Sequence, residues 1–281
     1  MIGNVEYEGK PLCQDSWSGI SALRVTRVLC LVVVFLPALV TAVSYVRRWC
    51  VHPRDPDAEP LPFTVRAVAF LGECLASTAL ILTWPFGWWR PARRGDGNGR
   101  RMIVLVPGLL LNRAALWPLR RRFERTGWSV VICASPPWRA SLDGRAHGLA
   151  RCLADATARH SSVTVVAFGR GGEVARHLLR RHPHAGIDRL VTLGTLHQRA
   201  APGAGRWART APAVPEDRLP YEMEVVAIYS DLDAVVPTAY AYYPGAFNIE
   251  VRGVGHVSLL TSRRVFELLA ENVAPADGAH A

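Results

Sequence analysis

Lysine is almost absent from this sequence of 281 residues, and its formal net charge of +10 at pH 7 comes almost entirely from arginine. A basic excess can indicate nucleic-acid binding, but the sequence has neither zinc-finger spacing nor an alternation of aromatic and basic residues. Arginine beside long apolar runs is more typical of a protein at an anionic membrane surface. We therefore expect membrane lipid as a partner and no nucleic acid.

Paired cysteines are lacking as well. The six cysteines show no C-x-x-C spacing, and two of them lie inside apolar runs. This pattern argues against a disulfide framework and against a metal site, and it favours small buried hydrophobic residues. We expect no metal ion and no nucleotide or other cofactor. The cysteines are Cys13, Cys30, Cys50, Cys74, Cys133 and Cys152.

The first long apolar run is Val28–Val46, 19 residues without a charge and with arginines on both sides. A helix of this length crosses the hydrocarbon core of a bilayer at roughly 1.5 Å per residue. A cleaved signal peptide is the alternative, but the run starts late, is too long and lacks a clear cleavage site of small residues. The sequence therefore predicts a retained transmembrane helix.

The second run, Ala67–Trp84, is shorter and carries Glu73 near its middle. A carboxylate in lipid is costly unless it is protonated, paired or turned inward. The run can be a second span packed on the first, or a helix lying in the membrane interface, and aromatic residues at its end suit both placements. We favour a helical hairpin of two spans. A slight arginine bias places both of its ends in the cytoplasm, which predicts an inner (cytoplasmic) membrane location with the following domain cytoplasmic.

The chain is thus expected to hold an N-terminal tail (1–27), a membrane segment (28–89), a basic linker (90–101), a soluble domain (102–275) and a C-terminal tail (276–281). In the soluble domain, six apolar runs rich in β-branched residues alternate with helix-compatible segments, which predicts an α/β fold whose mostly parallel sheet is covered on both faces. The expected strands are Met102–Val106, Ser129–Cys133, Val163–Ala167, Leu190–Leu193, Val225–Tyr229 and Asn248–Val251. The expected helices are Ala115–Arg125, Arg145–Arg159, Gly172–Arg181 and Ser262–Ala270.

Ligands and catalytic groups of open α/β sheets gather at the carboxyl ends of the strands, so the loops there are compared together. The first strand is followed by "VPGLLLNRAALWPL", the third by "AFGRGG", the fourth by "GTLHQ", the fifth by "SDLDAVVP" and the sixth by "GVGHVSLL". This ordered set resembles the lipase-like branch of the α/β-hydrolase family over about Arg101 to Val273. The most specific parts are D-x-V-V-P and G-x-G-H, in the family's order and spacing.

The resemblance implies roles for five residues. In the family's elbow, commonly G-H-S-x-G-G, the serine position falls on Gly169. Asp233 matches the triad carboxylate and His256 the triad base, while the backbone N–H groups of Leu109 and Arg170 match the oxyanion hole. A serine hydroxyl loses its proton to such a base during attack, and glycine has no side-chain atom that can attack. The attacking member of the triad is therefore missing.

The sequence departs from the family at neighbouring positions too. Pro107 stands where the oxyanion loop usually has histidine, Ala167 replaces the first elbow glycine and Phe168 the elbow histidine, and the usual "GTPHHG" after the fourth strand reads "GTLHQR". Several departures together argue against a single accidental substitution. We expect a membrane-anchored, lipase- or esterase-like protein without serine-hydrolase activity, which acts as a module that binds an acyl-type small molecule or a protein.

Other interpretations stay open. Gly169 can be an ordinary turn glycine in a domain that is no hydrolase, or the domain can serve only membrane assembly. An active lipase or carboxylester hydrolase is the principal alternative, with activated water or another nucleophile, for which Ser135, Cys133, Ser258 and Ser161 are the candidates. Asp231 is a substitute partner for His256. Arg170 could bind an anion together with the start of its helix, although a solvated arginine is the commoner case.

Overall fold

The computed structural model describes residues 17–51, 61–89, 101–133, 139–182, 186–198, 219 and 223–273. Most of the expected N-terminal tail, nearly all of the basic linker and the whole C-terminal tail lie outside these ranges. So does most of residues 199–220.

A sheet of six parallel strands, in the order β2-β1-β3-β4-β5-β6, forms the centre of the molecule. The strands are β1 (Arg101–Val106), β2 (Ser129–Ile132), β3 (Ser162–Phe168), β4 (Arg189–Leu193), β5 (Glu224–Ser230) and β6 (Phe247–Val251). All six predicted strands are confirmed to within a residue at each end. Because the chain moves outward from β1 to β2 and then returns to the other side of β1 with β3, the order of the strands reverses between β1 and β3. Open α/β sheets form a crevice at such a point.

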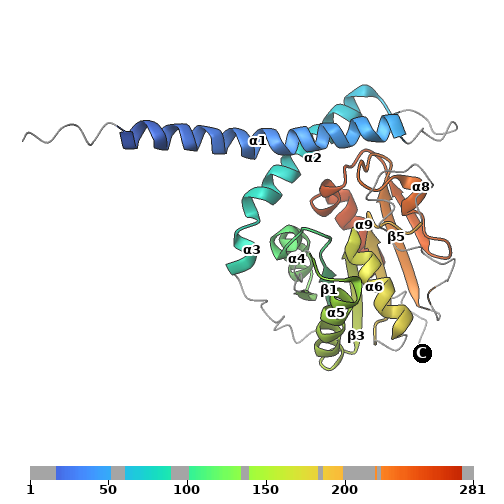
Figure 1. Cartoon of the computed structure of the whole chain (residues 1–281). Helices are drawn as coiled ribbons and strands as arrows, with labels where there is room; N and C mark the ends of the chain where they lie inside the picture. The colour runs from blue at the N-terminus through green and yellow to red at the C-terminus, as the bar shows by residue number, and fades with distance from the viewer. Residues whose placement is uncertain are drawn as a thin grey trace, which may run out of the picture.

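Helices cover both faces of the sheet (Figure 1). Helices α5 (Leu142–Thr157) and α6 (Arg170–Arg181) pack on one face, and α4 (Trp117–Arg125) and α9 (Arg263–Val273) on the other. Successive residues of β1 enter opposite cores, since Val104 belongs to the first and Ile103 and Leu105 to the second. A fully buried side chain of this size contributes roughly 1.5–3 kcal/mol to folding. The four predicted helices are confirmed, and the predicted Ala115–Arg125 begins in a short 3-10 turn, η1 (Arg113–Leu116).

Short elements complete the fold: α3 (Phe86–Trp89), α8 (Thr238–Ala241) and η2 (Val257–Leu260). Cys74, Cys133 and Cys152 form no disulfide; Cys133 is buried, while Cys74 and Cys152 are half-buried. Of these three, Cys133 alone fully meets the expectation of a small buried residue.

Two helices precede the sheet: α1 (Trp17–Val51) and α2 (Phe63–Thr83). They contact each other, with Tyr45 and Phe70 edge to face at a ring separation of 5.7 Å. Among the described residues, α2 is the one helix long and apolar enough to cross a membrane, judged by length and composition alone. The predicted first span, Val28–Val46, lies inside α1; among the residues of α1 whose side chains are described, the apolar segment is Phe35–Val46. The described residues thus offer one candidate span, and the span in α1, with the two-span hairpin, stays a prediction.

Helix α2 does not stand apart from the sheet domain. In Figure 1 it crosses α1 and then runs along the side of the domain toward α3 and α4. Its apolar side chains away from the domain are exposed: Phe63, Val68, Leu71, Leu75 and Leu82. One helix therefore has a face against the domain and an opposite face without cover.

Candidate functional site

The loop after β5 and the loop after β6 bring Asp233 and His256 together. His256 Nδ1 lies 2.6 Å from Asp233 Oδ2. The carboxylate is completely buried, and its other oxygen, Oδ1, accepts hydrogen bonds from the backbone N–H groups of Val235 and Val236 at 2.8 and 2.7 Å. These bonds fix the carboxylate's orientation, which in turn orients the imidazole and favours the tautomer with the proton on Nδ1.

Asp231, the substitute partner considered from the sequence, has a different position. Its Oδ1 accepts a hydrogen bond from the backbone N–H of Gly253 at 2.8 Å, and its Oδ2 lies 3.8 Å from Arg252 Nε. It therefore supports the turn after β6, and Asp233 is the carboxylate that contacts His256.

Opposing effects act on the protonation of His256. Burial on its own lowers the pKa of the imidazole, but the charge and hydrogen bond of Asp233, together with a smaller effect of Glu73, outweigh it, so the pKa lies above the ordinary 6.5. The ring of Phe168 packs against the imidazole at a centroid separation of 4.8 Å. The histidine is thus held on one side by a carboxylate and on another by an apolar ring.

Gly169 connects β3 directly to α6 with φ +52° and ψ −125°, a backbone conformation that residues with side chains rarely adopt. The turn is fixed by a hydrogen bond from Gly169 N–H to Leu193 O at 2.8 Å and by one from the Thr195 hydroxyl to Gly169 O at 2.9 Å. A Cβ placed on Gly169 would lie 3.7 Å from His256 Nε2, at ordinary contact distance. The position therefore faces the free nitrogen of the imidazole and has room for a side chain.

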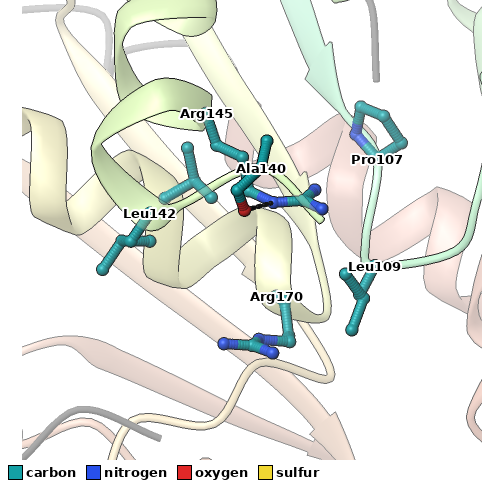
Figure 2. Close-up of a pocket in the computed structure, with 7 residues that line it drawn as sticks. Pro107, Leu109, Ala140, Leu142, Arg145 and Arg170 are labelled. Carbon is teal, nitrogen blue, oxygen red and sulfur yellow. Dashed lines mark hydrogen bonds between the residues drawn. The ribbon is translucent and has the colours of Figure 1, made fainter. Parts of the chain in front are cut away.

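Leu109 and Arg170 line a common cavity of about 100 Å³ beside this turn (Figure 2). The cavity lies where the loops after β1 and β3 meet, at the reversal of strand order. Arg170 is the first residue of α6, so its N–H has no acceptor within the helix. Gly171 allows the close approach, since a Cβ there would come within 2.7 Å of Val106 O and 2.9 Å of Pro107 O. The other described lining residues are Pro107, Ala140, Leu142, Arg145 and Val174.

Glu73 of α2 is the site residue that sequence reasoning missed. Its Oε1 accepts a hydrogen bond from the backbone N–H of Val257 at 2.7 Å, and its Oε2 accepts from the backbone N–H and the hydroxyl of Ser258 at 2.9 and 2.8 Å. The side chain is buried. The sequence signalled only that an isolated carboxylate in an apolar run needs a partner; it did not say that the partner is the loop carrying His256.

The carboxyl end of α2 contacts the loop after β1. Trp84 Nε1 donates to Leu110 O at 3.4 Å, and Asn112 Nδ2 donates to Trp84 O. Asn112 Oδ1 in turn accepts from Ala114 N–H at 3.0 Å and caps η1. Helix α2 is therefore bonded to two loops of the site, one carrying His256 and one leading out of β1.

The three candidate replacement nucleophiles that the structure describes do not lie in the elbow. Ser258 donates its hydroxyl to Glu73, and Cys133 is buried directly after β2. Ser161 precedes β3 and so lies at the opposite end of that strand from Gly169. Ser135 is outside the described residues. Within the described part of the chain, no group of three or more His, Cys, Asp and Glu residues could hold a metal ion.

No protein-family model matches the sequence. Among solved structures, the chain is similar to the mature form of Bacillus licheniformis lipase BlEst2, with a TM-score of 0.53 and 15% identity over 66% of this chain and 96% of that chain. It is also similar to a variant of PytH, with a TM-score of 0.51 and 15% identity over 63% of this chain and 99% of that chain. At such identities the likeness concerns the fold. The chain from β1 to α9 therefore has an α/β-hydrolase-like fold, with six parallel strands and flanking helices, related to that of lipases and esterases.

Proposed function

We propose that this protein is a membrane-anchored, lipase- or esterase-like α/β-hydrolase-fold protein without serine-hydrolase activity, and that it acts as a ligand-binding or interaction module. The observation that carries the proposal is the relation of Gly169 to His256. The site that a side chain at Gly169 would occupy lies 3.7 Å from the imidazole Nε2, and glycine places only hydrogen there.

A serine at position 169 could be activated by His256, whereas glycine cannot. A hydroxyl oxygen on a Cβ at that distance would come within hydrogen-bond reach of Nε2, which could then take its proton as the oxygen attacks a carbonyl carbon. A glycine hydrogen is neither acidic nor nucleophilic. The Asp233–His256 pair then serves to bind and orient, with no covalent step available through residue 169.

A second candidate is slow hydrolysis by a water molecule. The short His256–Asp233 contact favours it, because this pair is oriented as a base for a proton that Nε2 would receive. Without a covalent intermediate most of the rate advantage of the serine mechanism is lost. We therefore place ligand binding first.

For the membrane segment, the contacts of α2 support the interfacial placement over the two-span hairpin. Glu73, in the middle of α2, and Trp84, just after its end, both bond to the sheet domain. A helix that crosses the bilayer cannot have a water-soluble domain along its central turns. In our proposal α2 lies in the interface with Leu71, Leu75 and Leu82 toward lipid. The arginine bias was counted for a two-span hairpin and does not carry over to this placement, so the side of the membrane is tested directly by protease protection in vesicles.

The test of function is labelling of the intact chain with a fluorophosphonate, which reacts with activated serines. We expect no labelling of the native protein and labelling of Gly169→Ser, with Gly169→Ser/His256→Ala as the unlabelled control. Each variant is first compared with the native chain by thermal unfolding, because a serine in this backbone conformation carries roughly 1–3 kcal/mol of strain. Labelling of the native protein would overturn the proposal.

A further inference from the structure

Helix α2 has two faces with different surroundings. Val68, Leu71 and Leu75 are exposed and follow one another at intervals of three and four residues, so they form one apolar stripe along the helix. Ala69 and Glu73 are buried and lie on the other side of the helix, four residues apart. The buried side belongs to the sheet domain, along which α2 runs (Figure 1), and the apolar stripe is available to another apolar surface.

The domain face of α2 lies on the loop that carries His256. The Glu73 carboxylate accepts hydrogen bonds from the N–H groups of Val257 and Ser258 and from the Ser258 hydroxyl. Gly255 makes this approach possible, because a Cβ there would overlap the Glu73 carboxylate. The residues on both sides of the imidazole are therefore shaped for, or bonded to, one side chain of α2.

Few apolar contacts hold α2 to the domain. Of its residues, all of which the structure describes, only Ala69 and Glu73 are buried. Leu80 packs against the core while partly buried, and Trp84, just after the helix, donates to Leu110 O. Segments with few buried apolar contacts open locally without unfolding of the whole protein. The bonds of Glu73 therefore carry much of the attachment of α2 to the loop.

A lipid surface distinguishes attached from detached α2. In the attached helix, the apolar stripe can contact lipid while the Glu73 carboxylate keeps its three donors. In the detached helix, the same contact would bring Glu73 to the lipid without these donors, which is costly for a carboxylate. A surface that binds one of two states better shifts the equilibrium toward that state. Lipid on the stripe thus favours the attached helix, and with it the ordered loop.

We propose that contact of the Val68, Leu71 and Leu75 stripe with a phospholipid surface is coupled through Glu73 to the order of the loop that carries His256. Glu73 is then a positioning residue, which acts on the imidazole through Val257 and Ser258. The inference rests on the proposed function, from which it takes the interfacial placement of α2, and adds the regulation of the site: the loop is ordered on the membrane and opens more often away from it.

Glu73 acts on the charge of the imidazole as well. Burial lowers the pKa of His256, whereas the charges of Asp233 and Glu73 raise it. The remaining ring contact, Phe168, carries no charge. Titration of His256 therefore reports whether Glu73 is in place, and a change in fold stability alone does not move it.

Hydrogen exchange on the intact chain, in vesicles of equal parts phosphatidylcholine and phosphatidylglycerol, tests the coupling. Four proteins form a cycle: the native chain, Val68→Gln/Leu71→Gln, Glu73→Gln, and the variant with all three substitutions. We expect the Val257 and Ser258 amides to exchange about tenfold faster in Val68→Gln/Leu71→Gln, the change that corresponds to one lost hydrogen bond. They should also exchange faster in Glu73→Gln, where the substitutions on the stripe should have no further effect.

Matched controls are available on the sheet domain. Phe247→Gln removes a 64% exposed apolar side chain from the first residue of β6, at the opposite end of that strand from the His256 loop. Glu267→Gln removes a carboxylate whose side chain is 53% exposed on α9. Both should exchange at Val257 and Ser258 as the native chain does.

A titration of the histidine rings by NMR, on the intact chain in nanodiscs of the same lipids, gives the second readout. The signal that is missing in His256→Gln belongs to His256. We expect its midpoint to lie at lower pH in Glu73→Gln than in the native chain, because a negative charge that favours the imidazolium is gone. Glu267→Gln should leave the midpoint unchanged.

Three results would overturn the inference: unchanged exchange in Val68→Gln/Leu71→Gln, equal effects of the stripe substitutions with and without Glu73, or an unchanged His256 midpoint in Glu73→Gln. Flotation of the vesicles separates this failure from that of the proposed anchoring. A native chain that does not float with lipid contradicts both, whereas a floating chain with any of the three results contradicts the coupling alone. Fluorophosphonate labelling of the native chain overturns the loss of activity and not the coupling.

Discussion

Glu73 Oε2 accepts two hydrogen bonds from Ser258, one from its backbone N–H at 2.9 Å and one from its hydroxyl at 2.8 Å. Ser258 lies two residues after His256. A side chain from a helix outside the hydrolase-like fold therefore fixes the loop that carries the imidazole. The buried carboxylate gains the hydrogen bonds it would lack in lipid, and the loop gains an acceptor for two backbone N–H groups.

Replacement of this carboxylate should destabilise the protein. In Glu73→Ala the N–H groups of Val257 and Ser258 lose their acceptor, and we expect a loss of about 2–4 kcal/mol in the free energy of unfolding. Glu73→Gln keeps one oxygen and should lose less. Urea unfolding in detergent measures both. Leu75→Gln, at a 72% exposed position of the same helix, is the control and should leave unfolding almost unchanged. An unaltered midpoint in Glu73→Ala would contradict the contact.

The raised pKa of His256 predicts a pH dependence of stability. A base whose pKa is higher in the folded than in the unfolded chain stabilises the fold fully below its unfolded pKa, here close to 6.5, and this contribution is lost as the pH rises through the folded pKa. The free energy of unfolding of the native chain should therefore fall relative to that of His256→Gln as the pH increases above 6.5. Unfolding curves at several pH values measure this difference. If the free energies of unfolding of the two proteins change in parallel with pH, the prediction is refuted.

His197 should produce the opposite dependence. Burial and the charge of Arg176 lower its pKa well below 6.5, while its ring stacks on Tyr243 at 4.6 Å and Nε2 lies 2.9 Å from the Thr192 hydroxyl. The unfolded chain then takes up a proton that the folded chain refuses, so stability is lost as the pH falls below 6.5. In His197→Phe this acid sensitivity should be reduced. If the native chain and His197→Phe lose the same free energy of unfolding between pH 6.5 and 5, His197 is not held neutral in the folded chain.

Two glycines should respond in opposite directions to alanine. In Gly171→Ala the new Cβ would lie 2.7 Å from Val106 O, and because this neighbour is backbone we expect a loss of about 1–3 kcal/mol. Gly148 lies inside α5 with nothing within 4 Å of a Cβ, so Gly148→Ala should stabilise the protein by about 0.5–1 kcal/mol through helix propensity. Thermal unfolding of the two variants checks both signs at once.

The sheet and its helices could be predicted from the sequence because their signals are local. A strand buried on both faces is a short β-branched run, as in Val163–Ala167, and a glycine turn marks the start of α6. The pairing of Asp233 with His256 was implied by the resemblance to α/β-hydrolases, and the 2.6 Å contact agrees with it; both residues follow strands of one sheet, whose carboxyl ends share an edge.

The contacts of α2 could not be predicted in this way. Glu73 and Val257 are 184 positions apart, and no periodicity connects a carboxylate in an apolar run with two backbone N–H groups of a distant loop. Arg145 was missed as a cavity residue because it lies on α5 and not directly after a strand. The roles assigned to Leu109 and Arg170 stay predictions, although both residues line the cavity.

Because α2 is hydrogen-bonded to two loops of the site, the chain cannot be truncated before β1 without a loss of these bonds. A chain that begins at Arg101 would keep all six strands, Asp233 and His256. It would lose Glu73, which accepts hydrogen bonds from the N–H groups of Val257 and Ser258, and Trp84, which donates to Leu110 O. A domain boundary chosen from the similarity to lipases would therefore give a truncated chain in which the loop that carries His256 is less firmly held. Measurements on such a fragment would describe a different pocket from that of the intact protein.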